Sequence, residues 1–308
     1  MFSMHNIERI YIMSAMDHYK VFYRAVKTGS LTKAAEELYM TQPSASYAIR
    51  QLEEQLGAKL LVRRSKGVEP TGEGRVLFDY VERAFGLLQA GERKIGEMKS
   101  YGAGIVRLGA SDSLCKHYVL PLLESFRARY PGIRIQLSHG KSEDIAKRLA
   151  EGAVDCGIVH LPAGDGARIT ASRPIRDCFA AGPAFAELAA KPIEWRELAR
   201  QPFVLLSASS RTRTFLRAWM QSHGAEIEPD IELGSVDLLV EFAAKNIGVC
   251  FVTRDFIRRE LESGELIEIR TVEPIPERSI GVVSAPGASL SIAASLFVDE
   301  LSRHIASG

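Results

Sequence analysis

The sequence predicts a multidomain α+β protein, and three stretches of its 308 residues carry that prediction. Residues 29–62 read as two short helices with a tight break between them. Residues 72–99 carry apolar side chains at alternating spacings of four and three, which is typical of a long helix with a heptad seam. From residue 104 onward, apolar strand-like runs alternate with helical segments, which predicts α/β units built on a parallel sheet.

The composition is that of an ordinary globular protein, with 46% hydrophobic residues, 25% charged residues and a net charge of +1. No overall basic field attracts nucleic acid, so any such affinity must come from a local patch. No apolar run approaches the roughly 20 residues that span a bilayer. Residues 1–15 also lack the layout of a signal peptide. We therefore expect a cytoplasmic protein without membrane contact.

Capping residues define the two short helices. Ser30 and Thr32 are candidate N-caps of the first helix. Thr41 can cap the second helix, and Pro43 fits its first turn because a missing N–H costs nothing there. Gly57 then ends the second helix. A preceding helix is expected over residues 17–27.

The second helix has two contrasting faces. Its buried face is predicted from residues at helical spacing: Ala45, Ile49, Leu52 and Leu56. Its outer face carries polar side chains: Gln42, Ser44, Ser46, Tyr47 and Arg50. A short helix, a tight turn and a second helix with a polar outer face form a helix-turn-helix, whose second helix enters the DNA major groove.

The same region carries a family pattern in register: Gly29-Ser30-Leu31, Ala34-Ala35, Thr41-Gln42-Pro43, Ser46, Leu52-Glu53, Leu56-Gly57, Leu60-Leu61 and Arg63. With these residues the chain resembles the LysR-type transcriptional regulators, and the resemblance covers almost the whole chain. It implies a sequence-specific DNA-binding regulator controlled by a small ligand, without enzymatic activity, cofactor or metal. The family usually begins near Met16.

The resemblance implies a domain organisation: an extension over 1–15, a winged helix-turn-helix over 16–71, a dimerisation linker helix over 72–99, a hinge over 100–104 and an effector-binding domain over 105–308. The last resembles the type 2 periplasmic-binding-protein fold, with lobe I at about 105–176 and 279–308 and lobe II at about 177–278. Its strands are expected at 105–109, 133–137, 154–159, 179–181, 203–206, 231–233, 248–252 and 279–283. Its helices are expected at 114–129, 142–151, 213–223, 237–244 and 290–304.

Family roles carried over to matching positions place Gln42, Pro43 and Ser46 at base edges. Gln suits adenine, and Pro offers apolar contact to a thymine methyl group. Tyr47 departs from the family, which often has Arg, Lys or Gln there, and a tyrosine cannot make the bidentate guanine contact. The identity of the bases read at that position is therefore open.

Phosphate contacts are expected from a wing over residues 59–71, whose turn is 65–67. Its basic residues have no acid between them, although a solvated charged surface is the alternative. The complete expected DNA-binding set is Ser30, Thr32, Thr41, Gln42, Pro43, Ser46, Tyr47, Arg50, Arg63, Arg64 and Lys66. The expected partner is a duplex operator with inverted-repeat half-sites, and RNA polymerase is a further candidate partner.

The heptad seam of the long helix comprises Leu77, Val81, Ala84, Leu88, Gly91, Ile95 and Met98. A lone helix would expose this stripe to water, so we expect it to pair two subunits in a homodimer or homotetramer. Packing of the seam on the protein's own body is the alternative.

Polar loops follow several predicted strands of the effector domain. In open α/β sheets, ligands bind beyond the carboxyl ends of the strands, and hydroxyls and N–H groups at helix starts suit a small anion or carboxylate. The expected effector-binding residues are Ser111, Ser113, Gly140, Ser142, His160, Ser207, Ser209 and Thr253. Ordinary N-capping by Ser and Thr is the alternative reading.

Two other functions stay open. Cys115 and Cys178 make a thiol-based redox regulator of the same fold an alternative, although isolated cysteines are often small buried hydrophobic residues. A solute-binding or enzymatic α/β module is the other alternative. The sequence contains no recognisable hydrolase, metalloprotease or nucleotide-binding motif.

Overall fold

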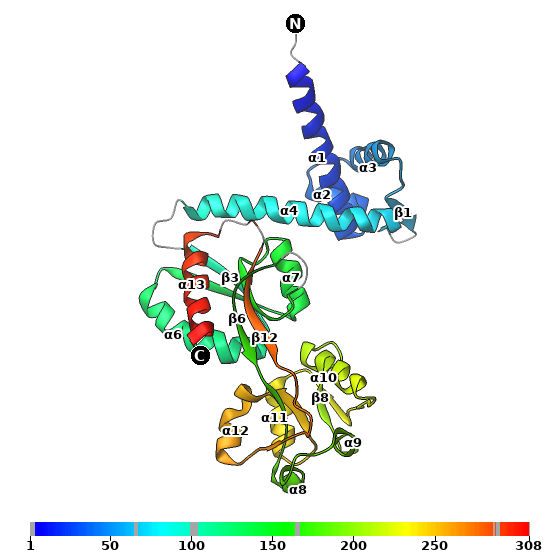
Figure 1. Ribbon diagram of the computed structural model, residues 1–308. Coiled ribbons are helices and arrows are strands. Elements are labelled where there is room, and N and C mark those ends of the chain that lie inside the picture. The colour runs from blue at the N-terminus through cyan, green and yellow to red at the C-terminus, as the bar shows by residue number, and fades with distance from the viewer. Residues whose placement is uncertain are drawn as a thin grey trace. The chain divides into compact units, whose positions relative to one another are not determined.

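The computed structural model describes residues 4–64, 67–98, 104–163, 167–285, 287 and 290–307. Side chains are described from Met16 onward, except those of residues 93, 94, 96–98 and 307. The predicted wing residue Lys66 and the side chain of the seam residue Met98 therefore lie outside the described part. The chain divides into two compact units, Met1–Gly91 and Glu92–Gly308 (Figure 1).

The N-terminal unit is a helical domain with a two-stranded wing (Figure 1). Its elements are α1 (Met4–Thr28), α2 (Leu31–Glu37), α3 (Gln42–Leu56), β1 (Leu61–Arg64), β2 (Gly67–Pro70) and α4 (Gly72–Met98), of which α4 continues beyond the unit. The strands β1 and β2 are antiparallel, as a wing requires. Helix α1 begins well before the predicted residue 17, inside the segment expected to be an extension.

The core of this domain lies between α1, α2, α3 and the start of α4. Phe22, Ala45 and Leu52 are fully buried in it, and Ile49 is nearly so. The prediction that Leu56 is buried is wrong, because it is the last residue of α3 and 42% exposed. Gly57 follows it in the left-handed region, with φ 65°, where glycine carries no steric penalty.

The turn between α2 and α3 holds Tyr39 in the same left-handed region, with φ 54°. Its N–H donates to the Glu36 carbonyl at 3.1 Å, and the Met40 N–H donates to the Ala35 carbonyl at 2.9 Å. This is the Schellman pattern, in which glycine is the usual residue. The Tyr39 side chain is 99% exposed, so no packing within the chain offsets the backbone cost.

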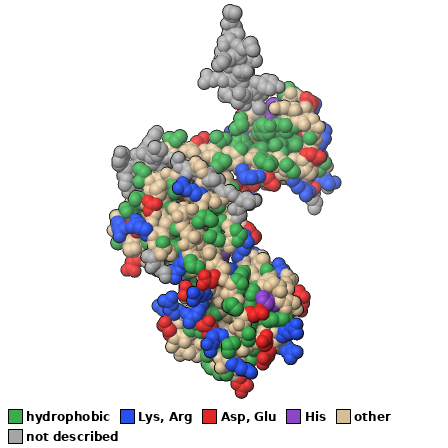
Figure 2. Space-filling view, in the orientation of Figure 1, with side chains coloured by type: hydrophobic (Ala, Val, Ile, Leu, Met, Phe, Trp, Pro, Cys, Tyr) green, Lys and Arg blue, Asp and Glu red, His purple; other side chains and the backbone are tan. Residues whose placement is uncertain are grey.

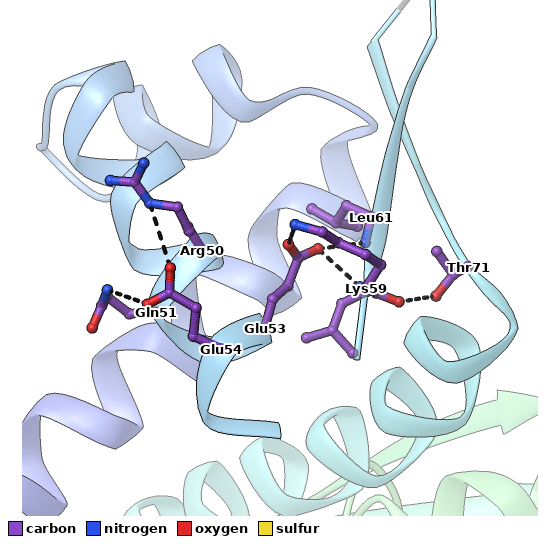
Figure 3. A network of polar contacts seen from close by, with 8 residues as sticks. Arg50, Gln51, Glu53, Glu54, Lys59, Leu61 and Thr71 are labelled. Carbon is purple, nitrogen blue, oxygen red and sulfur yellow. Dashed lines mark hydrogen bonds and ion pairs between the residues drawn. The ribbon is translucent and has the colours of Figure 1, made fainter. Parts of the chain in front are cut away.

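Glu53 ties the end of α3 to the base of the wing (Figure 3). Its carboxylate accepts the Leu60 N–H at 2.9 Å and the Leu61 N–H at 3.3 Å, and it pairs with the Lys59 Nζ at 2.6 Å. Thr71 adds a bond from its hydroxyl to the Lys59 carbonyl at 2.6 Å. Burial alone would raise the pKa of Glu53, but the hydrogen bonds from Lys59 and the two backbone N–H groups lower it below its usual value.

The predicted heptad seam of α4 divides into two parts. Leu77 packs on the core of the N-terminal domain, and Val81 is buried. Next to them, the Tyr23 ring stacks on Phe78 with 5.6 Å between centroids. Ala84, Leu88, Gly91 and Ile95 are instead exposed in the single chain. Figure 2 shows hydrophobic side chains gathered on the visible face of the N-terminal unit.

The second unit contains two α/β lobes. Lobe I is built on a five-stranded sheet of order β4-β3-β5-β12-β6. Its elements are β3 (Gly104–Ala110), α5 (Asp112–Leu114), a π-helical turn (Cys115–Val119), α6 (Leu120–Arg129), β4 (Ile133–His139), α7 (Ser142–Ala150), β5 (Cys156–His160), β6 (Arg168–Ile175), β12 (Arg278–Ser284) and α13 (Ile292–Ser307).

Lobe II lies between β6 and β12 in the sequence. It contains a three-stranded sheet of order β10-β7-β11 and the strand pair β8-β9. Its strands are β7 (Asp177–Ala181), β8 (Val204–Leu206), β9 (Ile231–Leu233), β10 (Cys250–Thr253) and β11 (Ile267–Ile269). Its helices are α8 (Ala186–Ala189), α9 (Trp195–Leu198), α10 (Arg211–Ser222), α11 (Val236–Ala244) and α12 (Arg258–Ser263), with 3₁₀ turns at Pro183–Phe185 and Arg254–Ile257.

Two strands connect the lobes. The chain leaves lobe I through β6 and returns through β12, and these two strands pair antiparallel along their length (Figure 1). The prediction of a parallel sheet, made for the strands at 105–159, holds for β4, β3 and β5. The returning strand β12 is antiparallel to β5, and β7 is antiparallel to both its neighbours, whereas β8 and β9 are parallel.

We expect Tyr39→Gly to raise the stability of the N-terminal domain by about 1 kcal/mol, because glycine removes the steric cost of the left-handed conformation. Far-UV circular dichroism during urea unfolding of the full chain follows both units. The chain has two tryptophans, Trp195 and Trp219, so tryptophan fluorescence reports on the second unit alone. The urea midpoint of the fluorescence transition should stay the same. If the midpoint of the circular-dichroism transition does not rise, Tyr39 does not strain the folded domain.

We expect Glu53→Gln to destabilise the N-terminal domain by about 1–2 kcal/mol at pH 7, since the charge that pairs with Lys59 is lost. Because the pKa of Glu53 is lowered in the folded state, its contribution is fully present above the ordinary value of 4.5 and is lost as the pH falls below it. Urea unfolding at pH 7 and at pH 4 measures both effects. The matched control is Glu54→Gln, whose exposed pair with Arg50 is worth well under about 1 kcal/mol. Equal losses in the two variants would refute the role of Glu53.

Candidate functional site

The outer face of α3 presents a small ordered group of polar side chains. The Gln42 Nε2 donates to the Ser46 Oγ at 3.0 Å, so the two side chains hold each other on one face. Gln42 and Pro43 are exposed, and Ser46 is half-buried. Tyr47 is also exposed, and the Arg50 guanidinium lies 5.6 Å from its ring centroid.

N-terminal caps fix how α2 and α3 begin and so orient the outer face of α3. Thr41 is the N-cap of α3, and its hydroxyl accepts the Ser44 N–H at 3.3 Å. Ser30 caps α2 in the same manner by accepting the Lys33 N–H at 3.3 Å. Thr32, the other cap candidate, is an exposed residue of α2. The first turn of α3 therefore stands in a fixed orientation above the buried face of the helix.

The basic residues of the wing are not all equally available. Arg63 is exposed, and Arg64 pairs with Glu69 across the hairpin at 3.3 Å. Lys59 belongs to the Glu53 network. Lys59 thus pairs with Glu53 of α3, and Arg64 pairs with Glu69 of the second wing strand.

The second candidate site is a cavity between the two lobes of the second unit, with a volume of about 160 Å³. It lies beyond the carboxyl ends of β3, β4, β5, β8, β9 and β10, as expected for an open α/β sheet. It is lined by Ser111, Asp112, Ser113, His139, Gly140, Lys141, Ser142, His160, Leu206, Ser207, Ser210, Arg211, Thr212, Gly234, Ser235, Val236, Val252, Thr253 and Phe256.

The structure brings most of the expected effector-binding residues together. Those that line the cavity are Ser111, Ser113, Gly140, Ser142, His160, Ser207 and Thr253. Ser209 does not line it, but its hydroxyl accepts a hydrogen bond from the Lys141 Nζ, which links lobe II to lobe I. The ligand role of this group stays a prediction.

Sequence reasoning missed the two cations of the cavity, Lys141 and Arg211. Both belong to the loops that it selected, but only the hydroxyls and Gly140 were chosen from those loops. Arg211 of lobe II reaches lobe I twice: its Nη2 donates to the Pro162 carbonyl at 3.3 Å, and its Nε lies 3.4 Å from the Glu143 Oε1. The carboxylate of Asp112 also lines the cavity and lies 2.6 Å from the His139 Nδ1.

Four helices begin at this cavity, namely α5, α7, α10 and α11. Ser111 caps α5, and Asp144 accepts the Lys141 N–H at the start of α7. Ser210 and Ser235, at the starts of α10 and α11, make no side-chain cap. The N–H groups of these two helices therefore add positive potential to the lobe II wall.

His160 ends β5 and is 8% exposed. Its backbone N–H donates to the Ser142 Oγ at 3.2 Å, whereas its ring Nδ1 is enclosed and has no hydrogen-bond partner. Burial, and then the positive charges of Arg278 and Arg211, lower the pKa of the ring to about 3. The imidazole is therefore neutral at pH 7.

A buried ion pair stands behind the cavity, where the connecting strands enter lobe II. The Arg278 guanidinium binds the Asp177 carboxylate through two nitrogens, with Nη2 to Oδ1 at 2.7 Å. The same Nη2 donates to the Thr212 Oγ1 at 3.2 Å, and the Thr253 hydroxyl donates to the Asp177 Oδ1 at 2.9 Å. Thr212 and Thr253 line the cavity, so the pair supports two of its walls.

The cysteines have the chemistry of buried thiols. Cys178 is buried and Cys115 half-buried, and burial raises the pKa of both, with added repulsion from Asp112 at Cys115. Burial raises the pKa of Cys250 to about 12 and that of Cys156 well above its ordinary value. Oxidants react with the thiolate, which these environments disfavour.

The described residues contain neither a metal-binding cluster nor a membrane-spanning helix. No three or more His, Cys, Asp or Glu side chains among them gather in a way that would hold a metal ion. No helix within the described ranges is long and apolar enough to cross a membrane.

Comparison with known proteins matches both units. Residues 16–75 match the family model described as bacterial regulatory helix-turn-helix protein, lysR family, and residues 100–306 match the LysR substrate binding domain. The uncharacterized regulator YeiE of Escherichia coli K12 is 29% identical over 284 residues, covering 91% of this chain and 94% of the relative. The activator CmpR of Synechocystis is 25% identical over 295 residues, covering 94% and 96%.

Solved structures share the fold. Full-length CbnR complexed with its target DNA has a TM-score of 0.60 at 16% identity, covering 94% of this chain and 99% of that one. Full-length BenM has a TM-score of 0.55 at 24% identity, covering 95% of each chain. Members of the matched family are transcriptional regulators, which are not enzymes. The chain belongs to the LysR family of DNA-binding transcriptional regulators.

Proposed function

We propose that this regulator binds an inverted-repeat operator through the exposed face of α3, with the wing on the flanking phosphates. The observation that carries the proposal is the Gln42–Ser46 pair, which is held on the outer face by a 3.0 Å hydrogen bond while Ala45, Ile49 and Leu52 anchor the helix behind it. The CbnR relative of the same fold was solved with its target DNA, which supports this placement.

The chemistry of the face restricts what it reads. Gln42 offers a donor and an acceptor that suit adenine, and Pro43 offers apolar contact to a thymine methyl group. Tyr47 with Arg50 over its ring provides an aromatic surface and a charge in place of a bidentate guanine contact. Among the described basic residues of the wing, Arg63 is exposed and forms no ion pair, and it contacts phosphate.

The active form is a homodimer or a dimer of dimers, paired through α4. Besides Leu88 and Ile95 of the predicted seam, α4 exposes the apolar side chains of Val76, Tyr80 and Leu87. A second copy of α4 is the simplest cover for this stripe. Leu77 and Val81 are not part of this exposed stripe, since Leu77 packs on the core of the DNA-binding domain and Val81 is buried.

A small anion or carboxylate in the inter-lobe cavity controls DNA binding. The cavity joins polar loops of both lobes, so a ligand that contacts both favours one lobe arrangement over another. The change then reaches the spacing of the DNA-binding domains through α4. RNA polymerase is a further partner of the bound regulator. The redox alternative gains no support, because the thiols of Cys115 and Cys178 both have raised pKa values.

The DNA contacts are tested by gel shift with fragments upstream of the regulator's own gene. We expect salt-sensitive, sequence-selective binding that Gln42→Ala weakens by roughly 5- to 150-fold, as loss of one base contact of about 1–3 kcal/mol requires. The control Gln51→Ala removes a glutamine of the same helix that bonds to Glu54 instead. Binding to no fragment, or equal losses in both variants, would count against the proposal.

The dimer is tested by light scattering after size exclusion. We expect Leu88→Arg to weaken dimerisation by tenfold or more, because burying a leucine contributes about 1.5–3 kcal/mol and a symmetric dimer buries it twice. Val272→Arg replaces an equally exposed apolar residue of lobe II and should leave the dimer intact. A wild-type monomer at micromolar concentration, or dissociation by both variants alike, would overturn the α4 interface.

A further inference from the structure

Thr71 joins the base of the wing to α4 through all of its polar groups. Its backbone N–H donates to the Leu60 carbonyl at 2.9 Å, and its hydroxyl donates to the Lys59 carbonyl at 2.6 Å. The same hydroxyl oxygen accepts the Gly74 N–H at 2.9 Å, and the Thr71 carbonyl accepts the Arg75 N–H at 2.9 Å. One residue therefore holds the segment that leads into β1 on one side and the first turn of α4 on the other.

Gly74 allows the first turn of α4 to lie directly on the backbone of the wing. A Cβ atom at Gly74 would be 2.0 Å from the Leu60 carbonyl oxygen and 3.0 Å from the Leu60 carbonyl carbon. The obstacle is backbone, so it cannot rotate out of the way as a side chain could. We call Thr71 and Gly74, with the carbonyl groups of Lys59 and Leu60 that they meet, the wing–α4 joint.

The same wing segment is also bonded to the recognition helix α3. Glu53 of α3 accepts the Leu60 N–H at 2.9 Å and pairs with the Lys59 Nζ at 2.6 Å (Figure 3). Leu60 thus donates its N–H to the end of α3 and accepts at its carbonyl from Thr71. A continuous series of hydrogen bonds therefore connects α3, the base of the wing and the start of α4.

Helix α4 rests on α1 as well, but through contacts of a different kind. Phe78 stacks on Tyr23 with 5.6 Å between ring centroids, and Phe85 lies tilted against the same ring at 5.5 Å. Apolar contact is non-directional, so it holds α4 on the domain without fixing its angle closely. Hydrogen bonds constrain both distance and angle. The direction of α4 relative to α3 is therefore set mainly at the wing–α4 joint.

A small tilt at the joint is large enough to matter on DNA. Leu88, in the exposed stripe, lies about 20 Å along α4 from Gly74 at about 1.5 Å per residue. A tilt of about 10° moves that point by roughly 3.5 Å, which is close to the rise of one base pair. In a dimer paired through the stripe, each subunit adds its own tilt to the separation of the two α3 helices.

We propose that Thr71 and Gly74 are positioning residues that set the separation of the two recognition helices and so select the spacing of the operator half-sites. They act through α4 rather than by touching a base. The inference rests on the proposed function, because it requires a dimer paired through α4 on an inverted repeat. It extends that function by assigning spacing selectivity to residues away from the DNA-reading face of α3.

The test uses the half-site recovered from the fragment upstream of the regulator's own gene. Duplexes carry two inverted copies of it, with the spacer varied in single base-pair steps over about one helical turn of 10 base pairs. In gel shifts with the full chain, we expect the wild type to prefer one spacer at least tenfold over spacers two base pairs longer or shorter. Thr71→Val has nearly the same shape without the hydroxyl and should reduce this preference to threefold or less.

Two further variants of the joint sharpen the result. Thr71→Ser keeps the hydroxyl and should retain the spacer preference of the wild type. Gly74→Ala forces α4 away from the Leu60 carbonyl and should move the preferred spacer by at least one base pair or reduce the preference to threefold or less. Circular dichroism checks that each variant is folded before its binding is measured.

The matched control is Thr28→Val in the same unit. The Thr28 hydroxyl donates to the Arg24 carbonyl at 2.8 Å and contacts the Ser30 carbonyl at 2.9 Å, so it serves α1 and the turn after it. This variant should keep the spacer preference of the wild type. Binding to a duplex with a single half-site and the mass from light scattering should stay within threefold and unchanged, respectively, in Thr71→Val, which separates positioning from folding and pairing.

Several results overturn the inference: the wild type shows no spacer preference, Thr71→Val keeps that preference, or Thr28→Val loses it equally. Loss of single half-site binding in Thr71→Val as large as its loss on the paired sites would make Thr71 a residue of folding alone. Failure of the proposed function gives a different pattern, in which the wild type binds no fragment or is a monomer. The joint then has no paired helices to position, and the inference falls with the dimer.

Discussion

The buried pair of Asp177 and Arg278 is the interaction on which the ligand-binding half of the molecule depends. Arg278 begins the strand that returns to lobe I, and Asp177 begins the first strand of lobe II. Their two-nitrogen contact joins the start of β12 to the start of β7, and Thr212 and Thr253 extend it to the cavity walls. Losing one partner of such a pair leaves an uncompensated buried charge, at a cost of about 3–5 kcal/mol. The pair therefore supports the cavity walls at Thr212 and Thr253.

A similar constraint acts in the DNA-binding domain on a smaller scale. The wing packs on the core through Leu60 and Val68. Glu53 adds a polar anchor, because one carboxylate receives the two backbone N–H groups that begin the wing together with the Lys59 ammonium (Figure 3). The resulting geometry couples the end of the recognition helix to the strand that carries Arg63. In both units, a charged group with all its partners inside the fold orients the surfaces that meet other molecules.

The sequence predicted features that depend on residues close together along the chain, and it missed contacts between residues far apart along the chain. Helical spacing located the buried Ala45 and Leu52, and the strand-then-loop order located Ser111, Ser142 and Ser207 at one cavity, because these are local patterns. The Asp177–Arg278 contact joins residues 101 positions apart, and no local pattern announces it. The strand at 168–175 was missed although residues 168–172 alternate between polar and apolar types, because Arg173 and Pro174 interrupt that pattern. Arg211 was missed for a different reason: hydroxyls were weighed ahead of a cation in the same loop.

The long helix α4 shows how far hydrophobic periodicity can predict packing. A heptad repeat indicates that one apolar stripe of a helix is buried, but it does not indicate which surface buries it. Leu77 packs on the domain's own core and Val81 is buried, while Leu88 and Ile95 are exposed in the described part of the chain. The heptad stripe is thus buried at its first residues and exposed further along, and the exposed part is the surface that the proposed dimer uses. The start of α4 therefore belongs to the core of the DNA-binding domain, whereas its later turns are available for the proposed pairing.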